Sequence, residues 1–268
     1  MIAFRILLIT FIIVIFAIFI NTELEIKNLN SKSIKFKNFN FQGIECIDDK
    51  IFIVSAFDSK IYKLNENLKL VEYLDTSLVY KNKYIFSNVN SFYIKNKIFY
   101  GVNSMANMNG VMVKSSIPRE KNTTKLSDLE YEIVNLDTNI NHIEYYSNGN
   151  EILINHSQSL KNNKNSIEIF VNKEFKCQIK NNIKIQNIYF DKRTNNVILI
   201  SNLFIHYIGM IYKLPISQIC NTQQIDFFNV KNKQLIIFPF YELEGYTVCK
   251  NKEFFVYING RDSHIYIK

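Results

Sequence analysis

Three features of the sequence predict an all-β fold of repeated sheets behind an N-terminal membrane helix. The clearest is an internal repeat, because residues 43–64 (GIECIDDKIFIVSAFDSKIYKL) return at residues 245–268 as GYTVCKNKEFFVYINGRDSHIYIK. Weaker copies of the same strand, turn and strand pattern lie between them, at 91–101, 143–154 and 188–199. The third feature is an apolar run near the N-terminus. The copies are spaced by about the length of a four-stranded blade, which predicts a five-bladed β-propeller preceded by one transmembrane helix.

The composition agrees with a folded chain and excludes several other classes. Of the 268 residues, 47% are hydrophobic and 14% aromatic, with seven Gly and three Pro, which excludes disordered and collagen-like chains. Four cysteines are too few for a disulfide-rich scaffold. The net charge of +8 comes from lysines spread singly among acids, whereas nucleic-acid binding needs a basic face or stripe. We therefore expect no nucleic-acid partner.

The N-terminal run predicts a membrane helix. Residues 6–20 are apolar except for Thr10, and the apolar residues before Arg5 extend the run to nearly the ~20 residues that a bilayer-spanning helix needs. No pair of small residues marks a cleavage site after the run, which favours an uncleaved signal anchor at 1–22 over a removed signal peptide. The positive charges before the run predict an N-terminus in the cytoplasm. Residues 23–268 are then expected on the extracytoplasmic side, periplasmic or extracellular.

Each copy has the pattern of a β-hairpin followed by further strands. A short apolar strand runs into a polar turn, such as Asp48-Asp49 or Lys95-Asn96, and a second strand rich in Ile, Phe and Val follows. A third strand is predicted in every copy, at 60–64, 110–114, 166–171, 209–214 and 264–268. A fourth strand is predicted in most copies, including 68–74, 131–136 and 174–179.

The fifth copy has no fourth strand of its own. The sequence stops after its third strand, and the segment 33–38 (SIKFKN) has the alternation to supply the missing one. A ring closed by strands from both ends of the domain removes the exposed sheet edge that invites pairing with other chains. We therefore expect residues 33–38 to close the last blade. The competing fold is a β-sandwich or barrel, which the similarity between the hairpins disfavours.

Two blade phrases carry a resemblance to a known group of proteins. They are residues 42–62, beginning Gln-Gly-Ile-Glu, and residues 244–268, beginning Glu-Gly-Tyr, and they follow an N-terminal anchor. With these features the chain resembles NHL-like β-propellers of the SdiA-regulated type, bacterial proteins with a membrane segment before an extracytoplasmic propeller. The chain has less Gly and Trp than is usual in that group.

One polar position recurs just after the second strand of the copies. In propellers this position lies at the mouth of the central channel, where loops converge. Amide side chains there would bind a sugar or a peptide carbonyl through paired donors and acceptors. With two glutamates of the blade phrases, the candidate ligand-binding residues are Asn103, Asn155, His156, Asn202, Asn259, Glu45 and Glu244. The alternative is a structural role, because Asn tolerates left-handed backbone and bonds its own chain in turns.

No catalytic motif accompanies these residues. The sequence has no G-x-S-x-G, P-loop or H-E-x-x-H motif, and the four histidines stand singly, so zinc is disfavoured. We predict a binding or scaffolding module for a protein, peptide or glycan, and leave open whether it is an enzyme. The alternative is a metal-assisted lactonase or related hydrolase that uses Glu45 or Glu244 with Asn155 and Asn202. Propeller cyclotransferases use an acid with tryptophans, which this chain lacks.

No cofactor is expected, and Ca²⁺ is the one ion that the sequence leaves open. Asp58 and Asp262 hold equivalent loop positions in the first and fifth copies, so a closed ring would make them neighbours. Paired carboxylates suit Ca²⁺ or a shared proton. We favour solvated turn residues, because no calcium-loop motif surrounds them.

The four cysteines fall in different copies. In an oxidising compartment, Cys46 with Cys249 or Cys177 with Cys220 would join neighbouring blades. Buried free thiols are the commoner state of cysteine in strands, and we expect them here.

Overall fold

The computed structural model describes eighteen segments of the chain, and the predicted signal anchor at 1–22 lies outside them except for Thr22. No helix within the described residues is long and apolar enough to cross a membrane. The only helix among them is a short 3-10 turn, η2 (Leu126–Asp128). The described residues are 22–26, 33–55, 58–80, 83–87, 89, 91–103, 111–116, 123–135, 142–145, 151–159, 164–172, 174–181, 185–191, 193–203, 208–215, 224–225, 233–237 and 241–268.

The described strands form five sheets of four or five strands, which we number I to V along the chain, and one two-stranded sheet. Sheet I contains β3 (Phe41–Ile47), β4 (Lys50–Ser55), β5 (Lys60–Leu64), β6 (Leu70–Asp75) and β12 (Thr123–Lys125). Sheet II contains β9 (Ser91–Lys95), β10 (Ile98–Asn103), β11 (Val111–Ser116) and β13 (Tyr131–Asn135). Sheet III contains β14 (His142–Tyr145), β15 (Glu151–Ser159), β16 (Lys164–Val171), β17 (Glu174–Asn181) and β21 (Gln224–Ile225).

The last two large sheets are built partly from N-terminal segments. Sheet IV contains β18 (Asn187–Asp191), β19 (Asn196–Leu203), β20 (Ile208–Pro215), β22 (Lys233–Ile237) and β1 (Thr22–Ile26). Sheet V contains β23 (Glu242–Cys249), β24 (Lys252–Asn259), β25 (Asp262–Ile267) and β2 (Ser33–Phe36). The two-stranded sheet pairs β7 (Leu78–Tyr80) with β8 (Lys83–Phe86).

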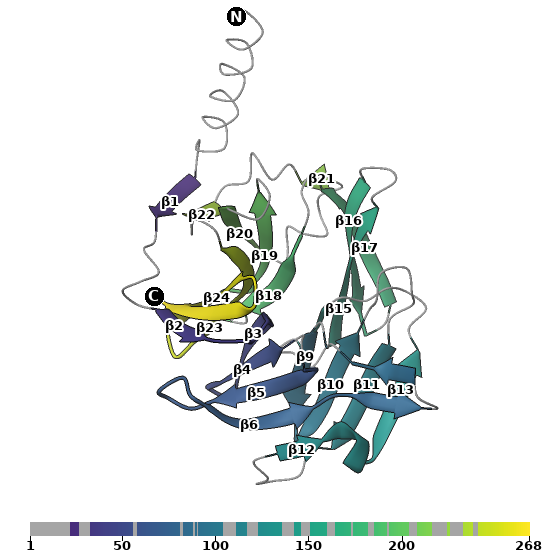
Figure 1. The fold of residues 1–268 in the computed structure, drawn as a ribbon. Helices are drawn as coiled ribbons and strands as arrows, with labels where there is room; N and C mark the ends of the chain where they lie inside the picture. Colours follow the sequence, from purple (N-terminus) through teal and green to yellow (C-terminus); the bar gives the residue numbers. More distant parts are fainter. Residues whose placement is uncertain are drawn as a thin grey trace, which may run out of the picture.

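The arrangement is that of a β-propeller (Figure 1). Each large sheet contains four antiparallel strands, to which three of the sheets add a fifth, and the first strands of neighbouring sheets contact one another. Side chains are described for sheets I, II, IV and V, and their hydrophobic residues pack between adjacent sheets. The all-β, propeller-like fold class predicted from the repeats is therefore confirmed at this level.

The hairpin turns explain why the repeat can be recognised in the sequence. Asp48 and Asp49 both have positive φ, at 49° and 59°, and Lys250 and Asn251 in the corresponding turn of sheet V have 46° and 64°. Two-residue hairpin turns of type I′ require positive φ at both central positions, and polar residues such as Asn and Asp tolerate it best. In sheet II the turn residues are Asn96 and Lys97, one position later than predicted.

Strand β2 completes sheet V. It pairs antiparallel with β25, with Ser33 opposite Tyr266 and Phe36 opposite Ser263, which is the pairing that we predicted for this segment. Lys35 Nζ lies 2.6 Å from Asp262 Oδ2, and the Ser263 hydroxyl donates to Phe39 O at 2.7 Å. The C-terminus thus lies beside β2 (Figure 1).

Three sheets carry an additional strand that we did not predict. Strand β12 adds parallel to β6, β21 to β17 and β1 to β22. These strands have two to five residues and reach their sheets from distant parts of the chain. Local alternation carries no information about such pairings.

Strand β23 of sheet V packs closely against β3 of sheet I. A Cβ added to Gly245 would lie 3.1 Å from Ile44 Cγ2 and 3.3 Å from Gly43 Cα. A side chain at Gly245 would therefore force β3 and β23 to move apart slightly, so glycine suits the close approach of the two backbones. Phe41, Ile53, Val256 and Ile265 belong to the hydrophobic cluster that fills the rest of this interface.

Stability should depend on the protonation of His264 in β25. The side chain is buried, its Nδ1 has no hydrogen-bond partner, and its ring meets Tyr241 edge-on at 5.0 Å. Burial lowers the pKa of His264, the Lys35 charge lowers it further, and Asp262 opposes them. The stabilising contribution of the neutral ring is thus full above the unfolded-state pKa near 6.5 and is lost as the pH falls from there towards the folded-state value.

We predict that the urea midpoint of unfolding falls between about pH 7.5 and about pH 5.5, and that His264→Gln reduces this fall. Carboxylates remain ionised over this range, and the other three histidines are common to both proteins. An equal pH dependence in the two proteins would contradict the assignment.

Candidate functional site

A pocket of about 470 Å³ lies where the first strands of sheets I, II, IV and V end. We call it the first-strand pocket. Each sheet contributes the last residues of its first strand or the turn that follows, so four separate copies of the repeat converge on one cavity. The lining residues are Glu45–Asp49, Phe92–Lys95, Tyr189–Asp191, Arg193 and Val248.

The first-strand pocket combines aromatic walls with charges of both signs. Phe92, Tyr93, Tyr189 and Phe190 line it, and all four side chains are buried. Burial, with the Glu45 charge adding to it, raises the pKa of Tyr189 to about 12. The Tyr189 hydroxyl therefore stays protonated at neutral pH and is suited to hydrogen bonding rather than to acting as a base.

The charged residues of the pocket are partly engaged by the fold. Asp191 is buried and accepts hydrogen bonds from Arg193 N at 3.1 Å and from Thr194 Oγ1 at 2.8 Å. Arg193 Nη1 donates to Asn251 Oδ1 at 2.8 Å, which ties a turn of sheet IV to a turn of sheet V. Glu45 and Lys95 are half-buried on the walls. The arrangement can hold a ligand that has both an apolar ring or face and polar groups.

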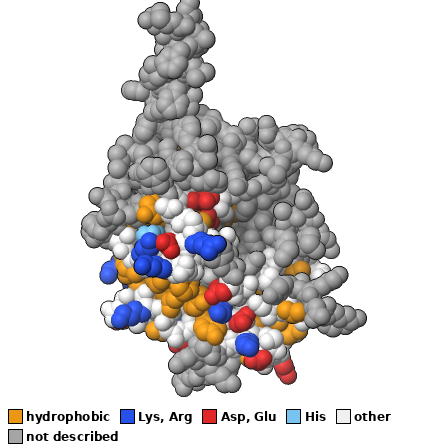
Figure 2. Space-filling model, in the orientation of Figure 1, with side chains coloured by type: hydrophobic (Ala, Val, Ile, Leu, Met, Phe, Trp, Pro, Cys, Tyr) orange, Lys and Arg blue, Asp and Glu red, His pale blue; other side chains and the backbone are white. Residues whose placement is uncertain are grey.

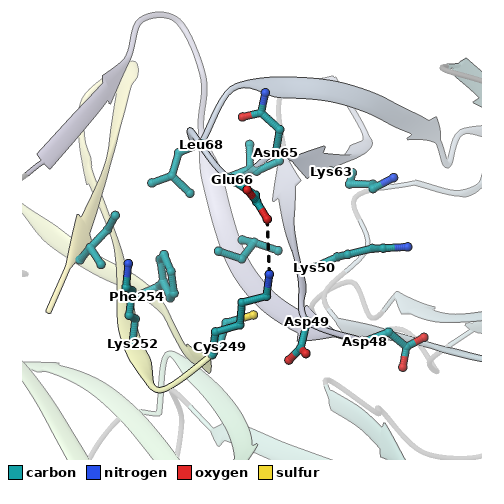
Figure 3. A pocket seen from close by; sticks show the side chains of 14 residues that line it. Asp48, Asp49, Lys50, Lys63, Asn65, Glu66, Leu68, Cys249, Lys252 and Phe254 are labelled. Carbon is teal, nitrogen blue, oxygen red and sulfur yellow. Dashed lines mark ion pairs between the residues drawn. The ribbon is translucent and has the colours of Figure 1, made fainter.

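A second cavity of about 580 Å³ lies between sheets I and V, and we call it the I–V groove (Figure 3). Its floor is apolar, with Leu64, Leu68 and Phe254 among the residues that form it. Its rim is charged, and an ion pair of 3.6 Å between Lys250 Nζ and Glu66 Oε1 crosses it. Because both charged side chains are largely exposed, this ion pair contributes little to stability.

A disulfide between Cys46 and Cys249 lies next to both cavities. The Cα atoms are 5.5 Å apart although 203 residues separate the cysteines in the sequence. Our expectation of free thiols was wrong at these two positions, and the alternative pairing of Cys46 with Cys249 is the one present, because β3 and β23 are neighbours where the first and last sheets meet. The Cys177 side chain and the whole of Cys220 lie outside the described residues, so their expected state stays a prediction.

The predicted amides lie at the other end of the sheets. Asn103 and Asn259 are the last residues of second strands, and Asn202 is the last but one of β19. Second strands run antiparallel to first strands, so these residues lie away from the first-strand pocket. Asn155 and His156 lie in β15, and their side chains are outside the described part of the chain. Of the predicted residues, Glu45 alone is among the described residues that line the pocket.

Two of the predicted amides bond to backbone. Asn202 Nδ2 donates to Leu243 O at 2.9 Å, and Leu243 N donates to Asn202 Oδ1 at 3.1 Å, which fastens sheet IV to sheet V. Asn103 is buried and donates to Ser87 O. Asn259 is exposed. This use of Asn103 and Asn202 agrees with the structural alternative, and their role in ligand binding stays a prediction.

The predicted Glu244 belongs to a polar cluster at the same end. Gln42 and Glu244 hold equivalent β-bulges in β3 and β23, each just before a glycine. Asn187 Nδ2 donates to both bulge carbonyls, at 3.1 Å to Gln42 O and 3.0 Å to Glu244 O. The buried Glu244 carboxylate accepts from Gln186 Nε2 at 3.3 and 3.1 Å. Bulges re-aim side chains, and here they present two backbone carbonyls to one amide.

The other predicted acids have separate partners. Asp58 accepts from the Tyr62 hydroxyl and lies 3.5 Å from Lys60 Nζ, whereas Asp262 pairs with Lys35. Within the described residues, the one group of three side chains that could ligate a metal consists of Cys46, Asp49 and Cys249. Neither predicted calcium ligand belongs to it.

Sequence reasoning missed most of the first-strand pocket. Tyr93, Tyr189 and Arg193 lie beside the polar turns that end or follow the first strands, whereas we searched the ends of the second strands. The signal that could have found them is their shared position in the repeat, immediately before or within the first turn.

Comparison with known proteins supports the fold and leaves the family open. No family model matches the sequence, and no curated protein matches it. Among solved structures, the chain is similar to glutaminyl cyclase from Myxococcus xanthus, at 10% identity over 92% of this chain and 98% of that one, with a TM-score of 0.53. This likeness shows a shared β-propeller-like fold alone.

Two further solved structures are similar at a lower level. Hydrazine synthase from Kuenenia stuttgartiensis matches at 8% identity over 86% of this chain and 59% of that one, with a TM-score of 0.44. A luciferin-regenerating enzyme matches at 10% identity over 85% and 76%, with a TM-score of 0.46.

The hydrogen bonds of Asn202 predict that it acts as a structural fastener, which holds sheet IV against sheet V. Asn202→Ala removes a donor and an acceptor from the Leu243 backbone and should lower the free energy of unfolding by about 1–3 kcal/mol, the usual cost of unsatisfied buried polar groups. The exposed Asn259→Ala serves as the control and should change it by less than about 0.5 kcal/mol. Chemical denaturation measures both. Equal effects would refute the fastener role.

Proposed function

We propose that the protein is a membrane-anchored, extracytoplasmic β-propeller of five blades that binds a protein, peptide or glycan at one rim. The five sheets of four or five strands support the number of blades. So do the contacts between consecutive first strands, which run from β3 through β9, β14 and β18 to β23 and back to β3. Assignment to the NHL-like, SdiA-regulated type rests on the two blade phrases and the N-terminal apolar run.

The disulfide supports an extracytoplasmic location. Disulfides persist in oxidising compartments and are rare where glutathione and thioredoxin keep thiols reduced. Cys46 and Cys249 are joined in a chain whose first residues have the apolar pattern of a signal anchor. The two observations are independent and favour the same side of the membrane.

The observation that carries the binding function is the convergence of four sheets on the first-strand pocket. Aromatic rings with polar groups around them are a common way to hold a sugar ring or a peptide side chain. On the face seen in Figure 2, lysine and arginine side chains are interspersed with acids and hydrophobic residues. Such a mixed surface suits a peptide or glycan better than a polyanion.

The same geometry favours binding over metal-assisted hydrolysis. The proposed lactonase set joined Glu45 or Glu244 to Asn155 and Asn202. Glu45 lies in the first-strand pocket, whereas Asn202 and Glu244 lie at the opposite end and bond to backbone and to Gln186. The set is therefore divided between the two ends of the sheets when it uses Glu45. When it uses Glu244, both described members lie at one end but are already bonded to Gln186 and to the Leu243 backbone, so we keep the hydrolase as the alternative.

A glycan and peptide array probed with the full-length protein should identify a ligand whose affinity depends on the first-strand pocket. Glu45→Gln and Lys95→Gln should each weaken binding about tenfold or more, since a hydrogen bond to a charged group contributes roughly 1.5–3 kcal/mol. Calorimetry with the identified ligand gives the dissociation constants.

The control is Asn259→Ala, at the opposite end of the sheets, which should leave the affinity unchanged. If Asn259→Ala or Asn103→Ala weakens binding and the pocket variants do not, the binding rim is the amide end. Turnover of a lactone or ester panel would instead favour the hydrolase.

A further inference from the structure

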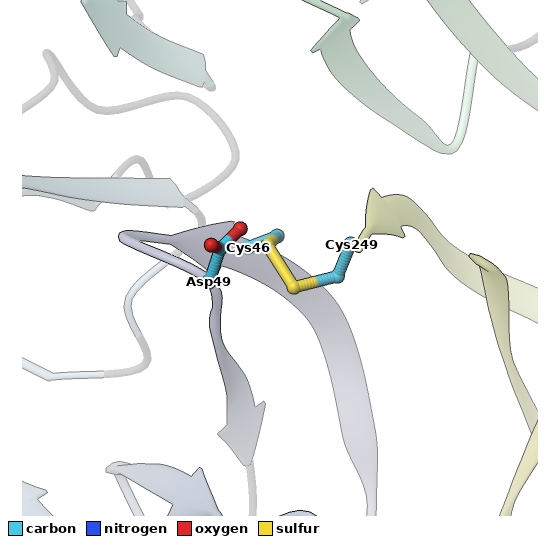
Figure 4. A group of neighbouring side chains, drawn as sticks. All are labelled: Cys46, Asp49 and Cys249. Carbon is cyan, nitrogen blue, oxygen red and sulfur yellow. A yellow bond between two sulfur atoms is a disulfide. The ribbon is translucent and has the colours of Figure 1, made fainter. Parts of the chain in front are cut away.

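Ring closure brings together three side chains that are candidate metal ligands. The sulfur atoms of Cys46 and Cys249 and a carboxylate oxygen of Asp49 all lie within 4.8 Å of one another (Figure 4). Cys249 is buried, Cys46 is half-buried and Asp49 is exposed, so the cluster has an open side towards solvent. In the disulfide form the sulfurs are bonded to each other and are not thiolate ligands.

We propose that reduction of this disulfide creates a binding site for a thiophilic divalent cation, with Zn²⁺ as the expected ion. A dithiol reductant supplies two electrons and two protons, the S–S bond breaks, and Cys46 and Cys249 become thiols while the reductant becomes a disulfide. The metal ion then displaces the two thiol protons to solvent and bonds to both thiolates and to Asp49. Water from the open side completes the four-coordinate shell.

The geometry suits this exchange because the backbone holds the ligands in place without the S–S bond. Cys46 is paired with Ile51 in its hairpin, and Cys249 is paired with Lys252. Asp49 lies in the two-residue turn between β3 and β4, at a φ of 59°. Zn–S bonds of about 2.3 Å and Zn–O bonds of about 2.1 Å place tetrahedral ligands roughly 3.5–4 Å apart. The three ligand atoms here lie within 4.8 Å of one another, close to that spacing.

Other contacts keep β3 beside β23 when the covalent link is cut. The Asn187 amide bonds to a carbonyl of each strand, and Gly245 packs directly on Gly43 and Ile44. Buried residues of both sheets form one hydrophobic cluster at this interface. The metal would therefore replace the disulfide as the bond between sheets I and V, and its binding energy would stabilise the closed ring.

The test uses the full-length chain with Cys177→Ser and Cys220→Ser, so that Cys46 and Cys249 are the only thiols. The protein is reduced, freed of reductant without air, and titrated with Co²⁺ as a spectroscopic probe and with Zn²⁺ as competitor. We expect one Co²⁺ per chain with a thiolate charge-transfer band, displacement by Zn²⁺, and a rise in the thermal midpoint of the reduced protein with Zn²⁺. The oxidised protein should show none of these changes.

Asp49→Asn and Asp48→Asn form a matched pair, because both residues have positive φ and Asn tolerates that conformation as Asp does. Asp49→Asn should weaken Co²⁺ binding at least roughly tenfold, since even outer-shell partners of metal ligands contribute ~10–100-fold, whereas Asp48→Asn should not. Equal effects of the two variants, or equal binding by oxidised and reduced protein, would overturn the proposal. Should reduction unfold the chain, Zn²⁺ must restore its β-sheet circular dichroism, and failure to do so would also overturn it.

Discussion

The packing of β23 against β3 is the contact on which the rest of the structure depends. It joins the last sheet to the first, and glycine at Gly245 lets the two backbones approach closely. The hydrophobic cluster, the Asn187 bridge and the Cys46–Cys249 bond all reinforce the same interface. Without this contact, sheets I and V would each expose a hydrophobic face, and neither the I–V groove nor the cysteine cluster would exist.

The direction of the strands divides the molecule into two chemically different ends. Where first strands end, aromatic walls and charges of both signs surround a cavity. Where second strands end, amides and a buried carboxylate bond mainly to backbone and to one another. Polar side chains at the second end therefore act between sheets, which leaves the first end as the better place for a ligand. The same turns that end the first strands position Asp49 beside the disulfide.

The sequence could predict what local pattern and repetition determine. Alternation and turn residues identified the hairpins, and the echo of residues 43–64 at the C-terminus identified the first and last sheets as equivalent units. Segment 33–38 was recognisable as a strand that has no hairpin partner beside it in the sequence and could complete the last sheet. Strands β1, β12 and β21 were not predictable, because each is a short parallel addition whose partner lies far away in the sequence.

The candidate site was predicted less well than the fold, for a physical reason. An Asn that recurs in a repeat can bind a ligand or can hydrogen-bond to the backbone of the protein itself. Asn202 does the second, because it bonds to the backbone of Leu243. The disulfide depends on the register between two strands 203 residues apart, which no local spacing encodes. Glu45 lies at a cavity because it is near the end of the first strand of its blade, and its role in ligand binding stays a prediction.

The most direct test of the closed arrangement is a disulfide map of the full-length protein. Proteolysis without reduction, followed by mass spectrometry, should yield one cross-linked pair of peptides that contains Cys46 and Cys249. A bond from either cysteine to Cys177 or Cys220 would show that the first and last sheets do not meet as described, and free thiols at both positions in air-oxidised protein would contradict the close approach of the two sulfur atoms.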